Sequence, residues 1–353
     1  MCLAWMALAC RPSSNAHDDA GLSTPSTALT DTPCATSCAT GLCQAGCQPL
    51  RLTATGVLAL AAAPGGVVAW ADGDGVHMVD RGKRREVSRS FATRVDKLTI
   101  AQDVVAWCGV EGCYAREGTR APVELKGDNF DFLTSDDVLT TDGKRIAVKL
   151  FSLRNEQVGH TEDWYENQPP VSGVYVDVFT LDGKATHALL GGASRGADDA
   201  LLLLRGAETL LGFEEEIKSF RGDASVEAAT FTKLPKGFGA IDGALRPGGI
   251  DVVAVACDKG DASNITPSGV CEDADSTFVL LRLGTRGAVE HTIKLASSYH
   301  FAGPGILDDG HQLFRVTDDK LEPLATHGAF AKTASDGTNA LYANGAVEIR
   351  TPP

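Results

Sequence analysis

The sequence predicts an all-β fold, a β-propeller of seven blades with four antiparallel strands each. Val67–Trp70 recurs unchanged at Val104–Trp107, 37 positions later, and Asp251–Ala254 repeats Asp103–Ala106. A period of this length made of short apolar strands is typical of one small sheet built many times. The apolar content of 43% is sufficient for a packed core, and the repeats begin near residue 51 of 353 and run to the end, which predicts one large domain.

The second repeat shows the predicted content of one blade most clearly. Its apolar segments are Lys97–Ile100, Val104–Trp107, Cys113–Arg116 and Pro122–Leu125, and turn residues separate them. Four short strands per unit are typical of a propeller blade.

Seven such units of about 45 residues fit the chain, within the range for propeller blades. We expect their second strands to begin near Val67, Val104, Arg145, Ala200, Val252, Gly305 and Asn339. A β-helix or another solenoid would have shorter coils with more uniform spacing. Six or eight blades are the alternatives, because the unit Gly196–Leu234 is poorly patterned and its segment Glu214–Lys218 is also compatible with a helical turn.

The last unit predicts how the ring closes. It contains strands at Asn339–Ala343 and Ala346–Arg350 but ends at Pro353 before a fourth strand. Leu50–Ala54 is apolar enough to supply the missing outer strand from the N-terminus. Closure of this kind removes a sheet edge that would otherwise invite aggregation.

The residues before the propeller (50–353) predict export. Cys2–Ala9 is a short apolar run that precedes Cys10 and resembles a bacterial lipoprotein signal, so residues 1–10 would direct export and Cys10 would be lipidated. A short buried N-terminal segment is the alternative. Residues 11–33 are rich in Ser, Thr, Pro, Ala and Asp and predict a disordered linker.

Eight further cysteines fall into neighbouring sets, which is typical of a disulfide framework in an oxidising compartment. Residues 34–49 form a cysteine-rich segment in which two disulfides are expected; a metal site is the alternative, and the pairing is open. The other two candidate pairs flank a hairpin turn and a polar loop. The eight residues are Cys34, Cys38, Cys43, Cys47, Cys108, Cys113, Cys257 and Cys271.

One predicted blade resembles a known family. Thr141–Val148 contains an Asp-Gly-Lys turn, and Gly173–Lys184 contains a Leu-Asp-Gly turn. This arrangement resembles a blade of the TolB-like bacterial propellers, in which such turns join the first two and the last two strands. Asp-Gly favours the positive φ angles of tight hairpins. The resemblance implies a periplasmic or surface scaffold that binds other molecules through its loops or central channel.

Composition argues against two classes of partner. The chain has 46 acidic and 32 basic residues, a net charge of -14, and its one basic run, Arg81–Arg85, falls at a predicted turn. Nucleic acid is therefore not an expected partner, because phosphate binding needs clustered cations. No window contains the roughly 18 apolar residues of a membrane-spanning helix, so contact with a membrane is expected only through a lipid anchor.

Motifs of catalysis and metal binding are weak. Gly192–Gly196 matches a nucleophile elbow around Ser194, but that motif requires a strand-to-helix turn, whereas here it joins two blades. The eight histidines show no i, i+2 or i, i+4 pair, and Asp72–Gly75 is more typical of a hairpin turn than of a calcium loop. We expect no catalytic residue, no metal and no cofactor.

The insertion between Leu153 and Val171 is the predicted interaction loop. Exposed aromatic side chains on loops are common anchors at interfaces. The alternative is that the two rings fold back over the blade edge. Its candidate binding residues are His160, Glu162, Asp163, Trp164, Tyr165 and Glu166.

These observations predict a non-enzymatic binding scaffold, exported and lipid-anchored at the bacterial envelope, in the periplasm or at the outer membrane or cell surface. Its partner would be another envelope protein, a peptide or a glycan, and the chain itself would be a monomer. The rival classes are an envelope hydrolase or lyase, with carboxylates or histidines of shifted pKa converging in the channel, and a small-ligand sensor with an apolar pocket.

Overall fold

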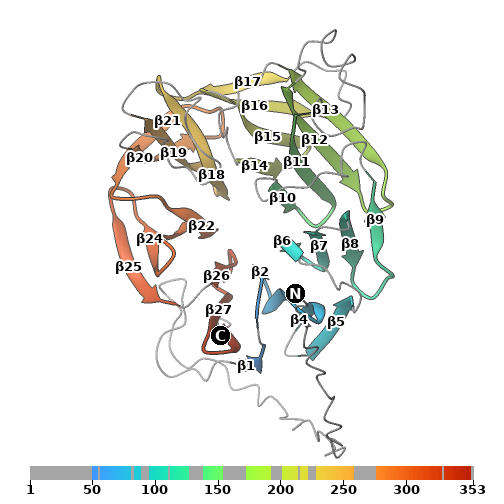
Figure 1. The fold of residues 1–353 in the computed structure, drawn as a ribbon. Coiled ribbons are helices and arrows are strands. Elements are labelled where there is room, and N and C mark those ends of the chain that lie inside the picture. Colours follow the sequence, from blue (N-terminus) through green and yellow to red (C-terminus); the bar gives the residue numbers. More distant parts are fainter. Residues whose placement is uncertain are drawn as a thin grey trace, which may run out of the picture. The chain divides into compact units, whose positions relative to one another are not determined.

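Strands account for all the regular secondary structure that the computed structural model describes. It describes residues 50–54, 56–80, 83–88, 95–109, 112–126, 138–153, 172–191, 201–213, 215–221, 228–257, 276–327 and 330–350. The described strands form seven antiparallel sheets of four, arranged in a ring (Figure 1). Seven blades are therefore confirmed, and the alternatives of six or eight blades and of a solenoid are wrong.

Each blade is given from its innermost strand outward, except that blade 7 receives its outermost strand from the N-terminus. Blades 1 to 3 are β2 (Ala59–Ala63), β3 (Val67–Asp72), β4 (Gly75–Asp80) and β5 (Lys83–Ser88); β6 (Val95–Ala101), β7 (Val104–Gly109), β8 (Gly112–Glu117) and β9 (Val123–Leu125); and β10 (Val138–Thr141), β11 (Arg145–Leu153), β12 (Ser172–Thr180) and β13 (Ala185–Gly191). Blades 4 and 5 are β14 (Leu202–Arg205), β15 (Glu208–Phe213), β16 (Glu216–Arg221) and β17 (Ala229–Lys233); and β18 (Phe238–Arg246), β19 (Gly249–Cys257), β20 (Ser276–Gly284) and β21 (Val289–Leu295). Blades 6 and 7 are β22 (His300–Gly303), β23 (Ile306–Asp308), β24 (Gln312–Val316) and β25 (Leu321–Thr326); and β26 (Phe330–Thr333), β27 (Asn339–Ala343), β28 (Ala346–Arg350) and β1 (Leu50–Thr53).

The N-terminal strand β1 closes the ring, as the sequence predicts. It pairs with β28 in antiparallel register, with Leu50 opposite Ile349. The Ala54 amide donates a hydrogen bond to the Gly345 carbonyl at 3.1 Å just beyond the strand. Blade 7 is therefore built from both ends of the propeller sequence.

One second strand lies elsewhere than predicted. A start near Ala200 is wrong, because Leu202–Arg205 is the innermost strand of blade 4 and the second strand begins at Glu208. The helical turn considered for Glu214–Lys218 is also wrong, since Glu216–Arg221 is strand β16. The bulge at Ile217 and Lys218 places the extra residue, Phe231, on the partner strand β17. The buried residues Ile217 and Phe220 are three positions apart because they lie on opposite faces of the blade, Ile217 packing toward blade 5 and Phe220 toward blade 3. This spacing resembles that of a helix.

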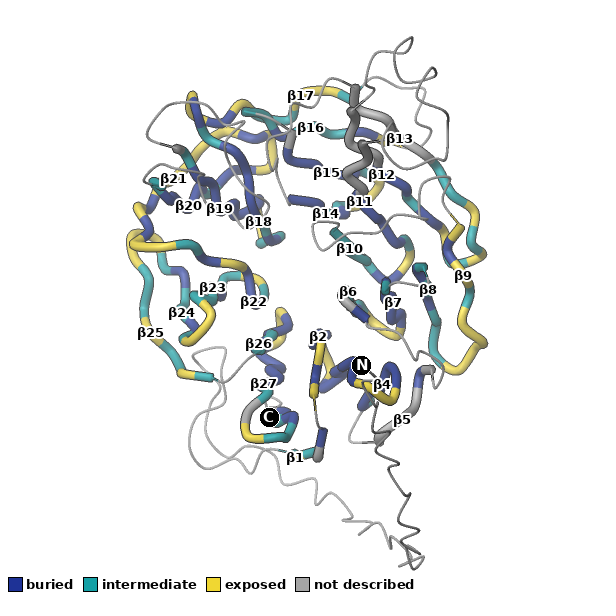
Figure 2. Tube along the Cα trace, viewed as in Figure 1, coloured by how far each residue is buried: buried dark blue, intermediate teal, exposed yellow. Residues whose placement is uncertain are grey.

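The blades pack against one another through both of their faces. All six residues of β3 are buried, and the second strands of the other blades are buried along most of their described length, whereas outer strands such as β25 are largely teal and yellow in Figure 2. Trp70 packs among residues of blade 7, and its repeat counterpart Trp107 packs among residues of blade 1. Each copy of the repeated sequence therefore places a tryptophan between its own blade and the preceding blade of the ring. We call this contact between two blades a seam.

The two ends of the ring have different connections. We call the end at which the first and second strands, and the third and fourth strands, are joined the turn end. Its described connections are short, and Gly143 and Gly183 adopt φ angles of 85° and 82° in the two turns of blade 3 that were predicted from their Asp-Gly sequences. The aspartates themselves do not adopt positive φ, because Gln102 and Asn344 are the only such non-glycine residues in the described ranges.

Hydrogen bonds between blades connect the turn end around much of the ring. An arginine of blades 3, 4 and 5 donates to a backbone carbonyl in a turn of the following blade, and a turn of blade 1 donates to a turn of blade 7. The pairs are Arg145 Nη2 to Gly206 O (2.6 Å), Arg205 Nη1 to Thr285 O (3.3 Å), Arg282 Nη1 to Thr317 O (3.2 Å) and Gly65 N to Asp336 Oδ2 (2.7 Å).

Asp251 is the centre of a charge network at this end. Its side chain is only 1% exposed and contacts Arg246 Nε at 2.9 Å and Arg282 Nε at 3.3 Å. Arg246 also pairs with Glu290, and Arg282 pairs with Asp318 of blade 6 at 3.0 Å. A buried carboxylate between two guanidinium groups is compensated only while all three are present.

Asp251→Ala is expected to lower the free energy of unfolding by about 3 to 5 kcal/mol, because it leaves two largely buried guanidinium groups without their shared partner. Asp318→Ala is the matched control. It removes a carboxylate that binds the same Arg282 but is 93% exposed, and should cost less than about 1 kcal/mol. Urea unfolding measures both values, and equal costs would contradict the importance of burial at Asp251.

Candidate functional site

Most of the predicted site residues lie outside the described ranges. These are the predicted interaction loop residues His160, Glu162, Asp163, Trp164, Tyr165 and Glu166, together with Cys10, Cys34, Cys38, Cys43, Cys47 and Cys271. Ser194, which the sequence argues against as a nucleophile, also lies outside these ranges. Cys257 ends β19, but its side chain is not described. Their roles therefore stay predictions.

The strands that flank the two long insertions place both at the same end of the ring. Residues 154–171 separate β11 from β12, and residues 258–275 separate β19 from β20, so each insertion is 18 residues long. Each joins the second and third strands of its blade, and antiparallel strands put those connections opposite the turn end. We call this the insertion end. The two insertions belong to blades 3 and 5, with blade 4 between them.

The corresponding hairpin of blade 1 is fixed by a polar cluster around Asp72. The buried Asp72 carboxylate accepts hydrogen bonds from Trp70 Nε1 at 3.3 Å and from the Asp74 amide at 2.9 Å, and it lies 2.9 Å from His77 Nε2. The Trp70 and His77 rings stack, with centroids 5.3 Å apart. The segment Asp72–Gly75 is thus a hairpin turn whose buried carboxylate is held by the protein itself.

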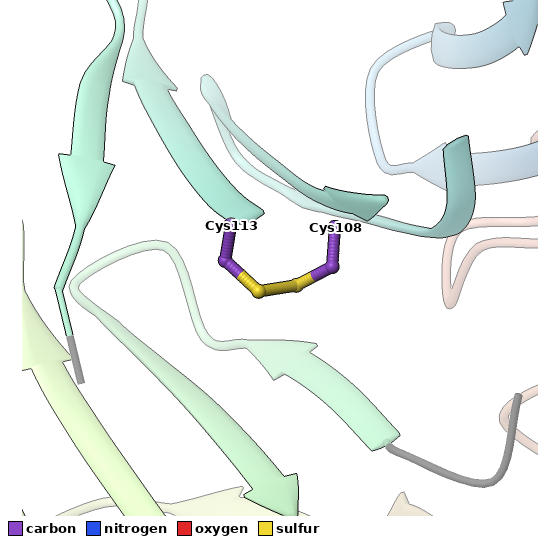
Figure 3. Close-up of a disulfide and its surroundings, with 2 residues drawn as sticks. All are labelled: Cys108 and Cys113. Carbon is purple, nitrogen blue, oxygen red and sulfur yellow. A yellow bond between two sulfur atoms is a disulfide. The ribbon is translucent and has the colours of Figure 1, made fainter. Parts of the chain in front are cut away.

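The corresponding hairpin of blade 2 is joined by a disulfide between Cys108 and Cys113 (Figure 3). These residues are direct cross-strand partners, with Cα atoms 4.1 Å apart. Trp107 and Tyr114 stack beside them, at positions equivalent to Trp70 and His77 of blade 1. Two neighbouring hairpins at the insertion end are therefore locked by different chemistry.

A second polar group lies in blades 5, 6 and 7. We call it the axial cluster, and it consists of Asp242, His300, Asp308, His327 and Lys332. Asp242, His300 and Lys332 belong to the innermost strands, whereas Asp308 ends the second strand β23 and His327 follows the outermost strand β25. His300 is the first residue of β22, which follows a connection at the insertion end. The cluster is therefore reached from the same end as the insertions.

Asp242 is fixed by backbone amides. A bulge between Ala240 and Asp242 interrupts the pairing of β18 with β19. The carboxylate of Asp242 accepts hydrogen bonds from its neighbour Gly243 N and from Phe301 N of blade 6, each at 2.7 Å. These two backbone donors hold the carboxylate in place.

The fixed carboxylate of Asp242 acts on His300. His300 Nδ1 lies 3.7 Å from Asp242 Oδ2, and the imidazole is 53% exposed. Interaction with Asp242 raises the pKa of His300 above its usual value, burial opposes this, and Asp308 contributes a smaller increase. The nearby charge of Lys332 lowers the pKa of His300. The net result favours the imidazolium form.

Two further contacts complete the axial cluster. Lys332 Nζ of blade 7 donates to the Phe301 carbonyl at 3.3 Å, so the backbone of Phe301 is bound from both neighbouring blades. Asp308 Oδ1 lies 2.8 Å from the fully buried His327 Nε2 and accepts the Gly310 amide at 2.8 Å. The cluster thus combines one exposed imidazole, one ammonium and two anchored carboxylates.

Sequence reasoning missed most of this cluster. His300 is recognisable only as one of the scattered histidines, and Asp242 and Lys332 have no motif around them. The available signal is a charged residue inside an apolar innermost strand, as between Ile241 and Gly243. In the described part of the chain, no group of three or more His, Cys, Asp or Glu side chains has the arrangement of a metal site.

Comparisons with known proteins find similarity only among solved structures. No family model and no curated protein matches the chain. The Neurospora crassa Pan2 WD40 domain is 11% identical, with a TM-score of 0.49 over 84% of this chain and 89% of its own. The WD40 propeller domain of Doa1 is 12% identical, with 0.49 over 86% and 95%, and the propeller domain of the Trilobed protease from Pyrococcus furiosus is 10% identical, with 0.48 over 83% and 90%. The seven four-stranded sheets themselves define the fold here.

No helix in the described ranges is long and apolar enough to cross a membrane.

His300→Gln is expected to remove a pH-dependent part of the free energy of unfolding. Because the folded pKa of His300 is raised, the protonated ring stabilises the fold fully below the unfolded value of about 6.5, and this contribution is lost as the pH rises through the folded pKa. Urea unfolding of wild type and variant on both sides of this range measures the difference.

The same comparison in an Asp242→Asn background tests the cause. With the principal anionic neighbour of His300 removed, the effect of His300→Gln should vary much less with pH. A difference that is independent of pH in the unchanged background would show that the pair does not act in this way.

Proposed function

We propose that the chain is a non-enzymatic binding scaffold that engages its partner at the insertion end. The observation that carries this proposal is the position of the two 18-residue insertions, which both leave the same end of the ring from blades 3 and 5. Rigid scaffolds commonly present binding residues on long loops. A partner that touches both insertions would span blade 4.

The turn end is less suited to this role. Its described connections are short, and several of their backbone groups bind the neighbouring blade. These contacts hold the blades together, whereas the insertion end has rigid hairpins in blades 1 and 2 beside the connections of blades 3 and 5. We therefore assign the candidate residues around Trp164 and Tyr165 to partner binding.

We further propose that the chain is exported and anchored at the bacterial envelope through a lipid on Cys10, as a TolB-like periplasmic or surface protein. The bond between Cys108 and Cys113 supports this, because structural disulfides persist mainly in oxidising compartments. Another envelope protein, a peptide or a glycan would be the partner.

An envelope hydrolase or lyase is the second candidate. It is favoured by the exposed imidazole of His300 beside the fixed carboxylate of Asp242, an arrangement suited to a general acid because the imidazolium form is favoured. In this alternative the activity would depend on His300, whereas partner binding would not.

The double variant Trp164→Ala and Tyr165→Ala is expected to lose the partner while the free energy of unfolding changes little. Cross-linking in the native envelope identifies the partner, and binding between the purified proteins should weaken about 30-fold or more if both rings are anchors. Val289→Ala is the control, because it trims an apolar side chain 47% exposed on the outer strand β21.

Unchanged binding to the identified partner would overturn the assignment of these two rings. A loss of several kcal/mol in stability would show instead that they cover the blade edge.

Cys10→Ser is expected to abolish lipid attachment, because the lipid is added to the thiol of this residue. Labelled palmitate and fractionation of the cell measure this directly: the label should disappear, and the protein should leave the membrane fraction. Cys2→Ser removes the neighbouring thiol and should retain both. Label retained in Cys10→Ser would contradict the anchor.

A further inference from the structure

Two side chains that can carry positive charge lie beside the backbone of Phe301 on the inner edge of the ring. His300 immediately precedes Phe301 in β22, and Lys332 Nζ is 3.3 Å from the Phe301 carbonyl. They are also close enough for the charge of Lys332 to lower the pKa of His300.

Both side chains retain hydrogen-bond donors that the described contacts do not use. His300 faces Asp242 through Nδ1, which leaves Nε2. An ammonium group has three N–H donors, and Lys332 makes one described hydrogen bond, to Phe301. An acceptor placed between the two side chains would receive a bond from each.

The nearby carboxylates are anchored by other donors. Asp242 accepts the amides of Gly243 and Phe301, and Asp308 accepts the amide of Gly310 and contacts His327. With His300 protonated, the two cations and two carboxylates sum to no net charge. Because the cluster has no net positive charge, it gives no net attraction for the second charge of a phosphate dianion, while the cost of removing that ion from water is higher than for a carboxylate. A ligand with one negative charge is therefore favoured.

We propose that His300 and Lys332 form a binding site for a carboxylate group at the inner edges of blades 6 and 7. The site uses neither insertion, so it goes beyond the proposed scaffold role and is tested separately from it. A carboxylate-bearing small molecule, or a carboxylate of a bound peptide, would receive one hydrogen bond from His300 Nε2 and one from Lys332 Nζ.

The site has a defined dependence on pH. Asp242 and Asp308 raise the pKa of His300 and Lys332 lowers it, while His327 contacts Asp308 from the far side. Since the carboxylate needs the imidazolium form, its binding should be strongest below the pKa of His300 and should weaken as the pH rises through that value. By linkage, a bound carboxylate must in turn raise this pKa.

The test is an NMR titration of the His300 ring in the full-length protein, with acetate replacing chloride at constant ionic strength. Acetate should move the titration of His300 to higher pH. Lys332→Gln, which keeps an N–H donor for Phe301 but removes the charge, should weaken acetate binding about tenfold, equivalent to about 1.4 kcal/mol. Lys320→Gln removes an exposed ammonium from a turn-end connection of blade 6 and should leave acetate binding unchanged.

Lys332→Arg separates charge from packing, because it should restore much of the acetate effect if the cation is what matters. Thermal unfolding of each variant confirms that it is folded. A His300 titration that acetate does not move would overturn the site, as would equal losses in Lys332→Gln and Lys320→Gln. Tighter binding of inorganic phosphate than of acetate would overturn the assignment to carboxylates.

Discussion

The packing of each blade between two neighbours is the constraint on which the rest of this structure depends. A sheet that is covered on both faces cannot alternate apolar and polar side chains, so β3 is buried at every position, and Trp70 and Trp107 fill equivalent places in successive seams. Charged residues on the middle strands must then be compensated locally, as Asp251 is by Arg246 and Arg282. The same constraint leaves the two ends of the ring and the inner strand edges as the places where sequence can vary for function.

Those places are used differently. The turn end is committed to holding blades together, through arginines that reach the next blade and through turns that bond to each other. The insertion end combines two long connections with hairpins fixed by the Asp72 cluster and by the Cys108–Cys113 bond. The inner edge contains Asp242, His300 and Lys332 of the axial cluster, and there side chains of blades 5 and 7 bind the backbone of Phe301 in blade 6. Rigid surroundings for polar groups are what a binding site requires.

Much of the fold was predictable because it follows from local pattern. Local sequence is enough to recognise the repeated Val-Val-Ala-Trp strands and the Asp-Gly turns. The missing last strand follows from counting the strands of each blade. Blade 4 was misread because its innermost strand is a plain apolar run and because Ile217 and Phe220, buried on opposite faces of β16, have a helix-like spacing. The Cys108–Cys113 pair was visible since its partners face each other across one hairpin. The axial cluster was not, because Asp242 and Phe301 are 59 positions apart and meet only through the register of two blades.

The closure strand also sets an order of events. Leu50 is among the first residues of the propeller to be synthesised and Ile349 is among the last, yet they are partners in one sheet. When the chain is synthesised or translocated from its N-terminus, β1 stays unpaired until β28 has been made, while the other blades can already form. A nascent chain, or one that has lost its C-terminus, therefore exposes the unpaired edge of β1. An exposed strand edge can pair with other chains and cause aggregation, whereas the closed ring has no such edge at this position.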